Sequence, residues 1–254
     1  MKTKIFDHIQ GQVKHNRKGI ALLIDPDDLT DQELHAALNN AIENKVDFLF
    51  VGGSLVTSDR MSHVISVIKS CTTIPCVIFP GHAMQVDGNA DAILFLSLIS
   101  GRNPELLIGQ QVIAAPILKR SKLEVISTGY LLVNSGKPTS ASYISNSMPI
   151  PNDKPSIAAS TALAGEMLGM KLMYLDAGSG ADSPVSTKVI RTVRNTVECP
   201  LIVGGGINHI SKAREALNAG ADILVVGNGA QKNLAFLNEV SELIHLLNEP
   251  LNVN

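Results

Sequence analysis

The sequence predicts an α/β protein with one domain over residues 1–254, a modified TIM (β/α)8 barrel in which a loop replaces the third helix. Short apolar runs alternate with helix-like segments along almost the whole chain, which is the pattern of a parallel sheet with crossover helices. The length of 254 residues matches the roughly 250 that one such barrel needs. Glycine-rich turns at 203–207 (VGGGI) and 226–229 (VGNG) follow the last two apolar runs.

Each predicted strand is a short apolar run that ends in Gly, Pro, Asp, Asn or Ser, and each predicted helix is a longer segment with amphipathic spacing. The predicted strands are residues 20–25, 48–52, 76–79, 92–98, 124–133, 171–176, 201–203 and 222–226. The predicted helices are residues 31–44, 58–70, 104–119, 157–168, 184–197, 210–219 and 233–247.

Two connections depart from the regular alternation. Residues 80–91 (PGHAMQVDGNAD) are too few and too rich in glycine for a packed helix, so we expect a loop between the third and fourth strands. Residues 134–155 carry four prolines and follow the fifth strand, and we expect an ordered loop over the barrel mouth there.

The composition bounds the class of protein. Hydrophobic residues make up 45% of the chain, which is enough for one large core, and the net charge of −2 provides no basic field for nucleic acid. No stretch has the length and hydropathy of a signal peptide or a membrane span. The three cysteines form no CxxC pair, so free thiols in a reducing cytoplasm are expected.

The glycine turns indicate an anion site. Parallel strands that end in glycine expose backbone N–H groups at their carboxyl ends, where a phosphate can bind. In an eight-stranded barrel the loops after the last two strands are the usual phosphate site. The turns at 203–207 and 226–229 therefore predict an enzyme that holds a phosphate monoester.

Acidic side chains at strand ends are candidates for chemistry. Asp25 ends the first strand, and with the Ser54 hydroxyl after the second strand it forms a plausible Mg²⁺ site, because Mg²⁺ uses one or two carboxylates together with phosphate oxygens. The alternative is that Asp25 caps the following helix. Asp27 is the better candidate for that N-cap.

Asp176 ends the sixth strand and precedes the glycine-rich segment 177–181. It is a candidate general base for a substrate hydroxyl, or alternatively a loop cap. Ser179 adds a hydroxyl to the anion site. Tyr174 either binds substrate or packs in the barrel, and the spacing does not choose between these roles. For His82 and His209 a loop role and a helix start, respectively, are favoured over catalysis.

Several segments together resemble the geranylgeranylglyceryl phosphate synthase family, prenyltransferases on a modified barrel without a regular third helix. The matching segments occur in family order over nearly the whole chain. They are 23–27 (LIDPD), 51–54 (VGGS), 103–109 (NPELLIG), 143–146 (YISN), 149–151 (PIP), 174–181 (YLDAGSGA), 203–207 (VGGGI) and 227–228 (GN).

This resemblance implies transfer of a geranylgeranyl or other polyprenyl group from its diphosphate to the 3-hydroxyl of sn-glycerol 1-phosphate, in ether-lipid synthesis. It also implies a homodimer or a hexamer. Asp25 and Ser54 would hold Mg²⁺, and Asp176 would be the base, although the family's usual acid at that position is glutamate. Glycerol phosphate would bind at Tyr174, Leu175, Asp176, Ala177, Gly178, Ser179, Gly180, Gly205, Gly206, Gly227 and Asn228.

The isoprenoid chain requires an apolar groove, which the fourth strand, residues 106–108 and the loop around Tyr143 could supply. Two other functions use the same phosphate turns. A sugar-phosphate isomerase or cyclase would have a second acid at the end of the fifth strand, where this chain has Asn134. A non-catalytic phosphate-binding barrel is favoured only by the shortened acid at Asp176.

Overall fold

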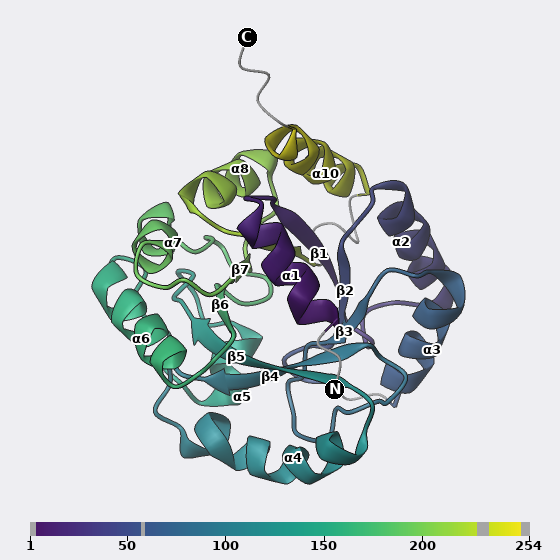
Figure 1. The fold of residues 1–254 in the computed structure, drawn as a ribbon, viewed down its shortest axis with the longest axis horizontal. Coiled ribbons are helices and arrows are strands. Elements are labelled where there is room, and N and C mark those ends of the chain that lie inside the picture. The colour runs from purple at the N-terminus through teal and green to yellow at the C-terminus, as the bar shows by residue number, and fades with distance from the viewer. Residues whose placement is uncertain (1–3, 57–58, 228–233, 250–254) are drawn as a thin grey trace.

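The computed structural model describes residues 4–56, 59–227 and 234–249. Its strands form one closed barrel in chain order, and every neighbouring pair is parallel, including β8 with β1. The predicted TIM-type barrel is therefore confirmed (Figure 1). The strands are β1 (Gly19–Ile24), β2 (Phe48–Val51), β3 (Cys76–Ile78), β4 (Ala92–Leu98), β5 (Glu124–Leu132), β6 (Leu172–Asp176), β7 (Leu201–Gly204) and β8 (Ile223–Val226).

Most helices surround the barrel (Figure 1), and the described ones follow the predicted segments closely except for α1, which was not predicted, and α5, which lies in residues 134–155, where a loop was expected. They are α1 (Lys4–Lys14), α2 (Asp31–Glu43), α3 (Met61–Cys71), α4 (Gln110–Arg120), α5 (Ser140–Ser145), α6 (Pro155–Met167), α7 (Thr187–Arg194), α8 (Ile210–Ala219) and α10 (Leu234–Asn248), with a π-helical turn η1 (Glu105–Gly109) before α4. Helix α7 starts later than predicted because the Ser186 hydroxyl accepts the Val189 N–H and caps it.

The connection between β3 and β4 contains turns and no helix, as expected from residues 80–91. Local contacts satisfy its polar groups. The Gln85 side chain accepts the Gly81 N–H at 2.7 Å, and the Asp91 carboxylate accepts the Cys76 N–H and the Lys69 ammonium, each at 2.8 Å. This connection therefore forms an ordered loop beside β4 in place of the third helix of a regular barrel.

Helix α1 was not predicted, and it lies across the end of the barrel where the strands begin (Figure 1). Phe6 and Ile9 are buried among inward-facing side chains such as Phe48. The Glu124 carboxylate, at the start of β5, accepts the backbone N–H groups of Ile5 at 2.7 Å and Phe6 at 2.9 Å. These contacts close the barrel at that end, so a ligand enters from the carboxyl ends of the strands.

We expect Glu124→Gln to lower the free energy of unfolding by about 1–3 kcal/mol, because it weakens charge-assisted hydrogen bonds to buried N–H groups. Urea unfolding measures the change. The matched control is Glu239→Gln on the exposed side of α10, with an expected change within about 0.5 kcal/mol. Equal, small changes in the two variants would contradict a stabilising role for Glu124.

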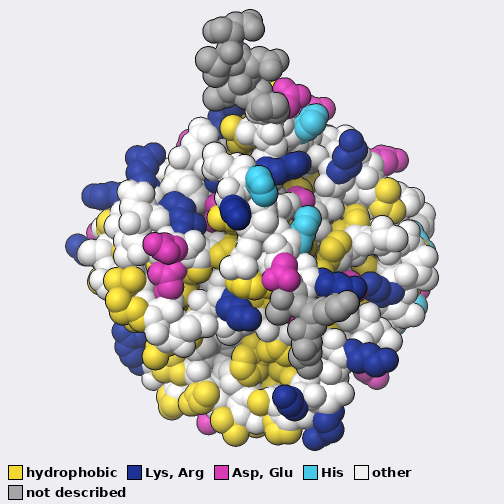
Figure 2. Space-filling model, viewed as in Figure 1, with side chains coloured by type: hydrophobic (Ala, Val, Ile, Leu, Met, Phe, Trp, Pro, Cys, Tyr) yellow, Lys and Arg dark blue, Asp and Glu magenta, His cyan; other side chains and the backbone are white. Residues whose placement is uncertain are grey.

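The surface of the face that carries α1 has Lys and Arg side chains interspersed with other types and no continuous basic stripe (Figure 2). None of the helices in the described ranges is long and apolar enough to cross a membrane. Cys71, Cys76 and Cys199 are all free thiols, as predicted.

Candidate active site

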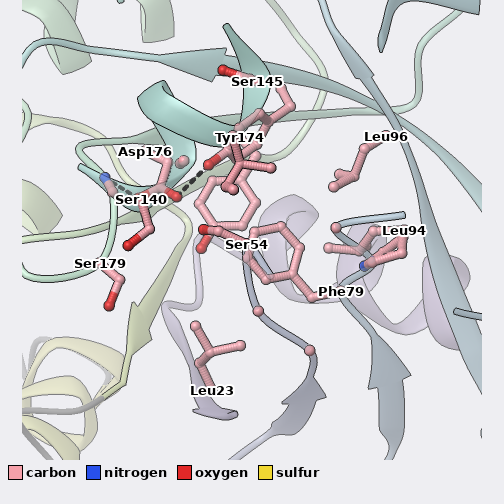
Figure 3. A pocket seen from close by; sticks show the side chains of 18 of the residues that line it. Leu23, Ser54, Phe79, Leu94, Leu96, Ser140, Ser145, Tyr174, Asp176 and Ser179 are labelled. Atoms are coloured by element: carbon pink, nitrogen blue, oxygen red, sulfur yellow. Dashed lines mark hydrogen bonds between the residues drawn. The ribbon is translucent and has the colours of Figure 1, made fainter. Parts of the chain in front are cut away.

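A cavity of about 800 Å³ opens at the carboxyl ends of the strands. In Figure 3 Asp176 and Ser179 lie on one side of the view, and Leu94 and Leu96 lie on the other. The cavity thus has a polar end at the barrel mouth and an apolar end beside β4. The predicted site residues that line its polar end are Asp25, Ser54, Tyr174, Asp176, Gly178, Ser179, Gly180, Gly205, Gly206 and Gly227.

Asp176 is the buried carboxylate of this polar end. It shares a strand face with Tyr174, because alternate residues of β6 point into the barrel. Its Oδ2 accepts a hydrogen bond from the Tyr130 hydroxyl at 2.5 Å, and its Oδ1 accepts the Gly178 N–H at 2.8 Å (Figure 3). Burial raises the pKa of Asp176, and these two hydrogen bonds oppose the rise. A carboxylate with a raised pKa takes up a proton more readily, as a general base must.

Backbone contact between two glycine loops forms the wall beside Asp176. Gly178, Gly205 and Gly206 have φ of 88°, 77° and 69°, in the left-handed region that favours glycine. A Cβ on Gly205 would lie 2.5 Å from Asp176 Oδ1 and 2.6 Å from the Gly178 nitrogen. The loops after β6 and β7 can therefore approach this closely only because glycine occupies position 205.

Gly227, at the end of β8, differs from the glycines of the loops after β6 and β7 in its backbone conformation and its contacts. A Cβ there would come no closer than 3.6 Å to Leu23, which is ordinary contact, and its φ is not positive. Among the described residues, none would therefore clash with a side chain at Gly227. Asn228, the other predicted residue of this turn, lies outside the described residues.

Asp25 lies at the end of β1 and lines the same cavity. Its Oδ1 accepts the Asp27 N–H at 3.0 Å, and a Cβ on Gly53 would lie 2.4 Å from its Oδ2. Burial raises the pKa of Asp25, and the neighbouring charges of Asp28 and Asp27 add to the rise. The position of Gly53 brings the loop after β2 directly against this carboxylate.

The prediction of Asp27 as a helix N-cap is wrong, and so is the alternative that gave Asp25 this role. Helix α2 begins with Thr30, whose hydroxyl accepts the Glu33 N–H while the Glu33 carboxylate accepts the Thr30 N–H. This reciprocal capping box satisfies the first turn without an aspartate. The carboxylate of Asp25 therefore faces the cavity for a reason other than capping.

The donor set around Asp25 fits a hard cation. Asp28, which the sequence interpretation missed, lines the cavity with Asp25 and Ser54, and these side chains offer two carboxylates and a hydroxyl. The described part of the chain has no group of three or more His, Cys, Asp or Glu side chains placed so that they could together hold a metal ion. Oxygen ligands in such small number suit Mg²⁺ that is also held by phosphate oxygens of a substrate. The sequence did offer one signal for Asp28 as a site residue, because it belongs to the same acidic run as Asp25, residues 25–28 (DPDD).

The apolar end of the cavity extends around β4. Leu94 and Leu96 face the barrel interior, whereas Ile93 and Phe95 lie on the opposite face of the strand. The cavity reaches both faces because the β3–β4 connection carries no helix. Other apolar lining residues come from η1, α4 and α5, namely Leu106, Ala114, Leu118 and Ile144. An apolar groove is therefore present, but of residues 106–108 only Leu106 lines it, and Tyr143 is 83% exposed and does not line it.

An aromatic cluster lies beneath Asp176, and two of its members, Phe79 and Tyr130, were not predicted as site residues. Tyr174 is 1% exposed and stacks on Phe79 with 5.1 Å between ring centroids, and Tyr130 meets Tyr174 edge-on at 5.5 Å. Tyr174 therefore packs in the barrel and also borders the cavity. The sequence signal for this placement of Tyr174 was its position two residues before Asp176, which puts both side chains on the inward face of β6.

Two predicted binding residues have side chains elsewhere. Leu175 and Ala177 point into the outer hydrophobic core and do not line the cavity. Their positions follow from strand alternation, since Tyr174 and Asp176 take the inward face.

The two histidines occupy local roles. His82 is at the cavity mouth, where its Nδ1 accepts the Met84 N–H at 3.2 Å, a contact within its own loop. His209 caps α8, as expected, and accepts the Ser211 N–H at 3.2 Å.

The closed parallel barrel, the glycine loops after β6 and β7 and the carboxylates at the same end define a TIM barrel with a cavity lined by glycine loops and carboxylates at its carboxyl-terminal face. The family model described as the PcrB family matches residues 12–243. The chain belongs to this family.

Relatives of known name resemble the chain over nearly its full length. The geranylgeranylglyceryl phosphate synthase of Spirosoma linguale is 52% identical over 92% of this chain and 94% of its own length. The protein of the same name from Chitinophaga pinensis is 47% identical over 96% and 97%. The crystal structure of (S)-3-O-geranylgeranylglyceryl phosphate synthase from Thermoplasma acidophilum, in complex with its substrate sn-glycerol-1-phosphate, has a TM-score of 0.90 and 34% identity over 96% of this chain and 99% of that one.

Proposed function

We propose that this protein transfers a geranylgeranyl group from its diphosphate to the 3-hydroxyl of sn-glycerol 1-phosphate and releases diphosphate. The observation that carries the proposal is one cavity that joins a polar end with glycine loops and carboxylates to an apolar end around β4. The names of the relatives at 52% and 47% identity, and the substrate in the Thermoplasma acidophilum complex, support the same reaction.

Each end of the cavity suits one part of the reaction. The backbone at Gly178–Gly180 and Gly205–Gly206 and the Ser179 hydroxyl would bind the phosphate of glycerol phosphate. Asp176 would be the final acceptor of the hydroxyl proton. The apolar end beside Leu94 and Leu96 would hold the isoprenoid chain and exclude water from it.

The diphosphate would lie against Asp25, Asp28 and Ser54. Mg²⁺ held by these side chains would offset the charge of the diphosphate and so improve it as a leaving group. As the bond to diphosphate breaks, positive charge develops on the allylic carbon. The electron-rich faces of Phe79, Tyr130 and Tyr174 and the Asp176 carboxylate would stabilise that charge.

The experiment that tests the proposal is an assay of radiolabelled sn-glycerol 1-phosphate with prenyl diphosphates of graded chain length, with and without EDTA. We expect label in the organic phase, the highest rate with geranylgeranyl diphosphate, and loss of activity with EDTA that Mg²⁺ restores. Binding of glycerol phosphate without turnover with any donor would instead support a non-catalytic barrel. Turnover of aminoimidazole-type substrates would support an isomerase. Asn134 argues against that function, because it stands where an isomerase would have its second acid, and its Oδ1 accepts the Gly136 N–H of its own loop.

The geometry of the glycine loops leads to a prediction for the binding of sn-glycerol 1-phosphate. We expect Gly206→Ala to weaken sn-glycerol 1-phosphate binding at least about tenfold, or about 1.4 kcal/mol, and Gly227→Ala to change it less than about threefold. A Cβ on Gly206 would lie 2.9 Å from the Pro184 nitrogen and 3.0 Å from the Ser183 carbonyl group, at a φ of 69°, whereas Gly227 has room.

Calorimetric titration of both variants with each substrate makes the measurement. The prenyl diphosphate should bind to Gly206→Ala nearly as it does to the unaltered protein. Equal losses for both substrates would mean that the substitution damages the barrel as a whole.

The homodimer or hexamer remains a prediction from the resemblance, and a cytoplasmic location remains a prediction from the free cysteines. Size-exclusion chromatography with light scattering measures the mass of the assembly, and a monomer at micromolar concentration would contradict the first prediction.

A further inference from the structure

Each carboxylate oxygen of Asp176 already accepts one hydrogen bond from the protein. Oδ1 accepts the Gly178 N–H, and the backbone of Gly205 lies against the same oxygen. Oδ2 accepts the Tyr130 hydroxyl at 2.5 Å. The residue is only 7% exposed. Both carboxylate oxygens therefore already have protein donors.

Tyr130 is more accessible than the carboxylate that it contacts. It lies on β5, directly beside Tyr174 of β6 in the sheet register, and it lines the cavity. Phe79 and Tyr174 hold its ring, with centroids 6.0 and 5.5 Å away. Within the described ranges its hydroxyl donates to Asp176 and its oxygen accepts no hydrogen bond. The Tyr130 oxygen can therefore accept a hydrogen bond from a ligand while its proton remains on the bond to Asp176.

We propose that Tyr130 is a catalytic residue that relays the proton of the acceptor hydroxyl to Asp176. The inference rests on the proposed function, because it concerns the same transfer. The bond between the glycerol 3-oxygen and the first prenyl carbon forms as the bond from that carbon to diphosphate breaks, and its electron pair leaves with the diphosphate. The proton of the 3-hydroxyl passes to the Tyr130 oxygen, and the phenol proton passes to Asp176 Oδ2.

Concerted movement of the two protons agrees with the environment of both groups. Burial, the charge of Asp176 and the hydrogen bond to it raise the pKa of Tyr130 well above its ordinary value, so a free phenolate is unfavourable. Burial also raises the pKa of Asp176, which makes it a better final acceptor. Tyr174 is the other titratable side chain at this carboxylate, and its pKa is also raised, chiefly by burial.

Tyr130→Phe distinguishes a relay from a positioning role. If Tyr130 only positions Asp176, the substitution frees Oδ2 to take the proton directly, so kcat falls a few-fold. It also removes a hydrogen bond that lowers the pKa of Asp176, so the acid limb of the kcat profile moves to higher pH. In a relay the phenol oxygen is itself required. We then expect kcat to fall at least about 100-fold with KM for glycerol phosphate nearly unchanged.

The closing experiment measures single-turnover rates for the unaltered protein, Tyr130→Phe, Asp176→Asn and the double variant, with Tyr143→Phe as the exposed control. A relay predicts that the double variant is no slower than the slower single variant, because both residues serve one step. It also predicts a curved dependence of the rate on the deuterium fraction of the solvent for the unaltered protein. Incorporation of 3-fluorotyrosine at position 130, which preserves the fold and makes the phenol more acidic, should change the rate.

The outcomes separate this inference from the proposed function. Activity of Tyr130→Phe within about fivefold of the unaltered protein, or a rate that does not respond to 3-fluorotyrosine, overturns the relay and leaves the transferase function standing. An unaltered protein that turns over none of the prenyl diphosphates overturns both. Thermal melting and calorimetric binding of glycerol phosphate confirm that each variant is folded, so a loss of rate can be assigned to the reaction.

Discussion

Asp176→Asn is expected to lower kcat by about 10²–10⁴-fold, the usual contribution of a general base, while sn-glycerol 1-phosphate still binds. The amide keeps the shape of the carboxylate. Its oxygen can accept the Gly178 N–H, and its NH₂ group can donate to the Tyr130 oxygen, while the Tyr130 O–H, which loses its acceptor, can turn toward the cavity that Tyr130 lines. The variant should therefore fold normally but cannot take up the hydroxyl proton.

Steady-state kinetics with calorimetric binding of glycerol phosphate measures this result. Asp176→Glu should retain more activity than Asp176→Asn because it keeps a proton acceptor. The matched control is Asp153→Asn, an exposed carboxylate outside the cavity, with no expected effect. Normal turnover of Asp176→Asn would mean that another group is the base and that the mechanism proposed above is wrong.

The raised pKa of Asp176 sets the direction of the pH dependence. The base acts as a carboxylate, so kcat of the unaltered protein should fall as the pH falls through this pKa, which lies above the ordinary value of 3.8. In the folded protein the carboxyl holds its proton more tightly than in the unfolded chain. Ionisation of Asp176 therefore destabilises the fold as the pH rises through this window, and Asp176→Asn should remove that dependence.

Asp25→Asn should lower kcat by about 10²–10³-fold and leave the affinity for glycerol phosphate nearly unchanged. Asp25 lies at the end of β1 and lines the cavity with Asp28, Ser54 and the glycine loops after β6 and β7. A cation site there acts on the departure of diphosphate, so the substitution should affect turnover more than phosphate binding. It should also raise the Mg²⁺ concentration that gives half-maximal activity.

A titration of activity with Mg²⁺ at saturating substrates makes the measurement. Asp27→Asn is the matched control, since Asp27 is an exposed carboxylate of the same loop and does not line the cavity. If Asp25→Asn keeps a near-normal kcat at saturating Mg²⁺, Asp25 has a structural role.

Local patterns in the sequence were sufficient to predict the architecture, and most of the candidate site residues that they indicated line one cavity. A parallel barrel strand is a short apolar run followed by a break. That signal lies within a few residues, so the strands were found with ends shifted by at most one position. The loop at 80–91 followed from its length and glycine content. Asp25, Asp176 and the glycine turns were found because they directly follow strands, and the fold brings all strand ends to one face.

The tertiary structure alone decided which of these residues touch. Tyr130 and Asp176 are 46 residues apart, and Glu124 and Ile5 are 119 apart, so no local pattern pairs them. Backbone geometry determined that Thr30, and not Asp27, caps helix α2. The apolar cavity extends around β4 because the connection between β3 and β4 has no helix. Sequence periodicity reports which face of a strand or helix is apolar, whereas closure of the barrel determines the neighbours of each side chain.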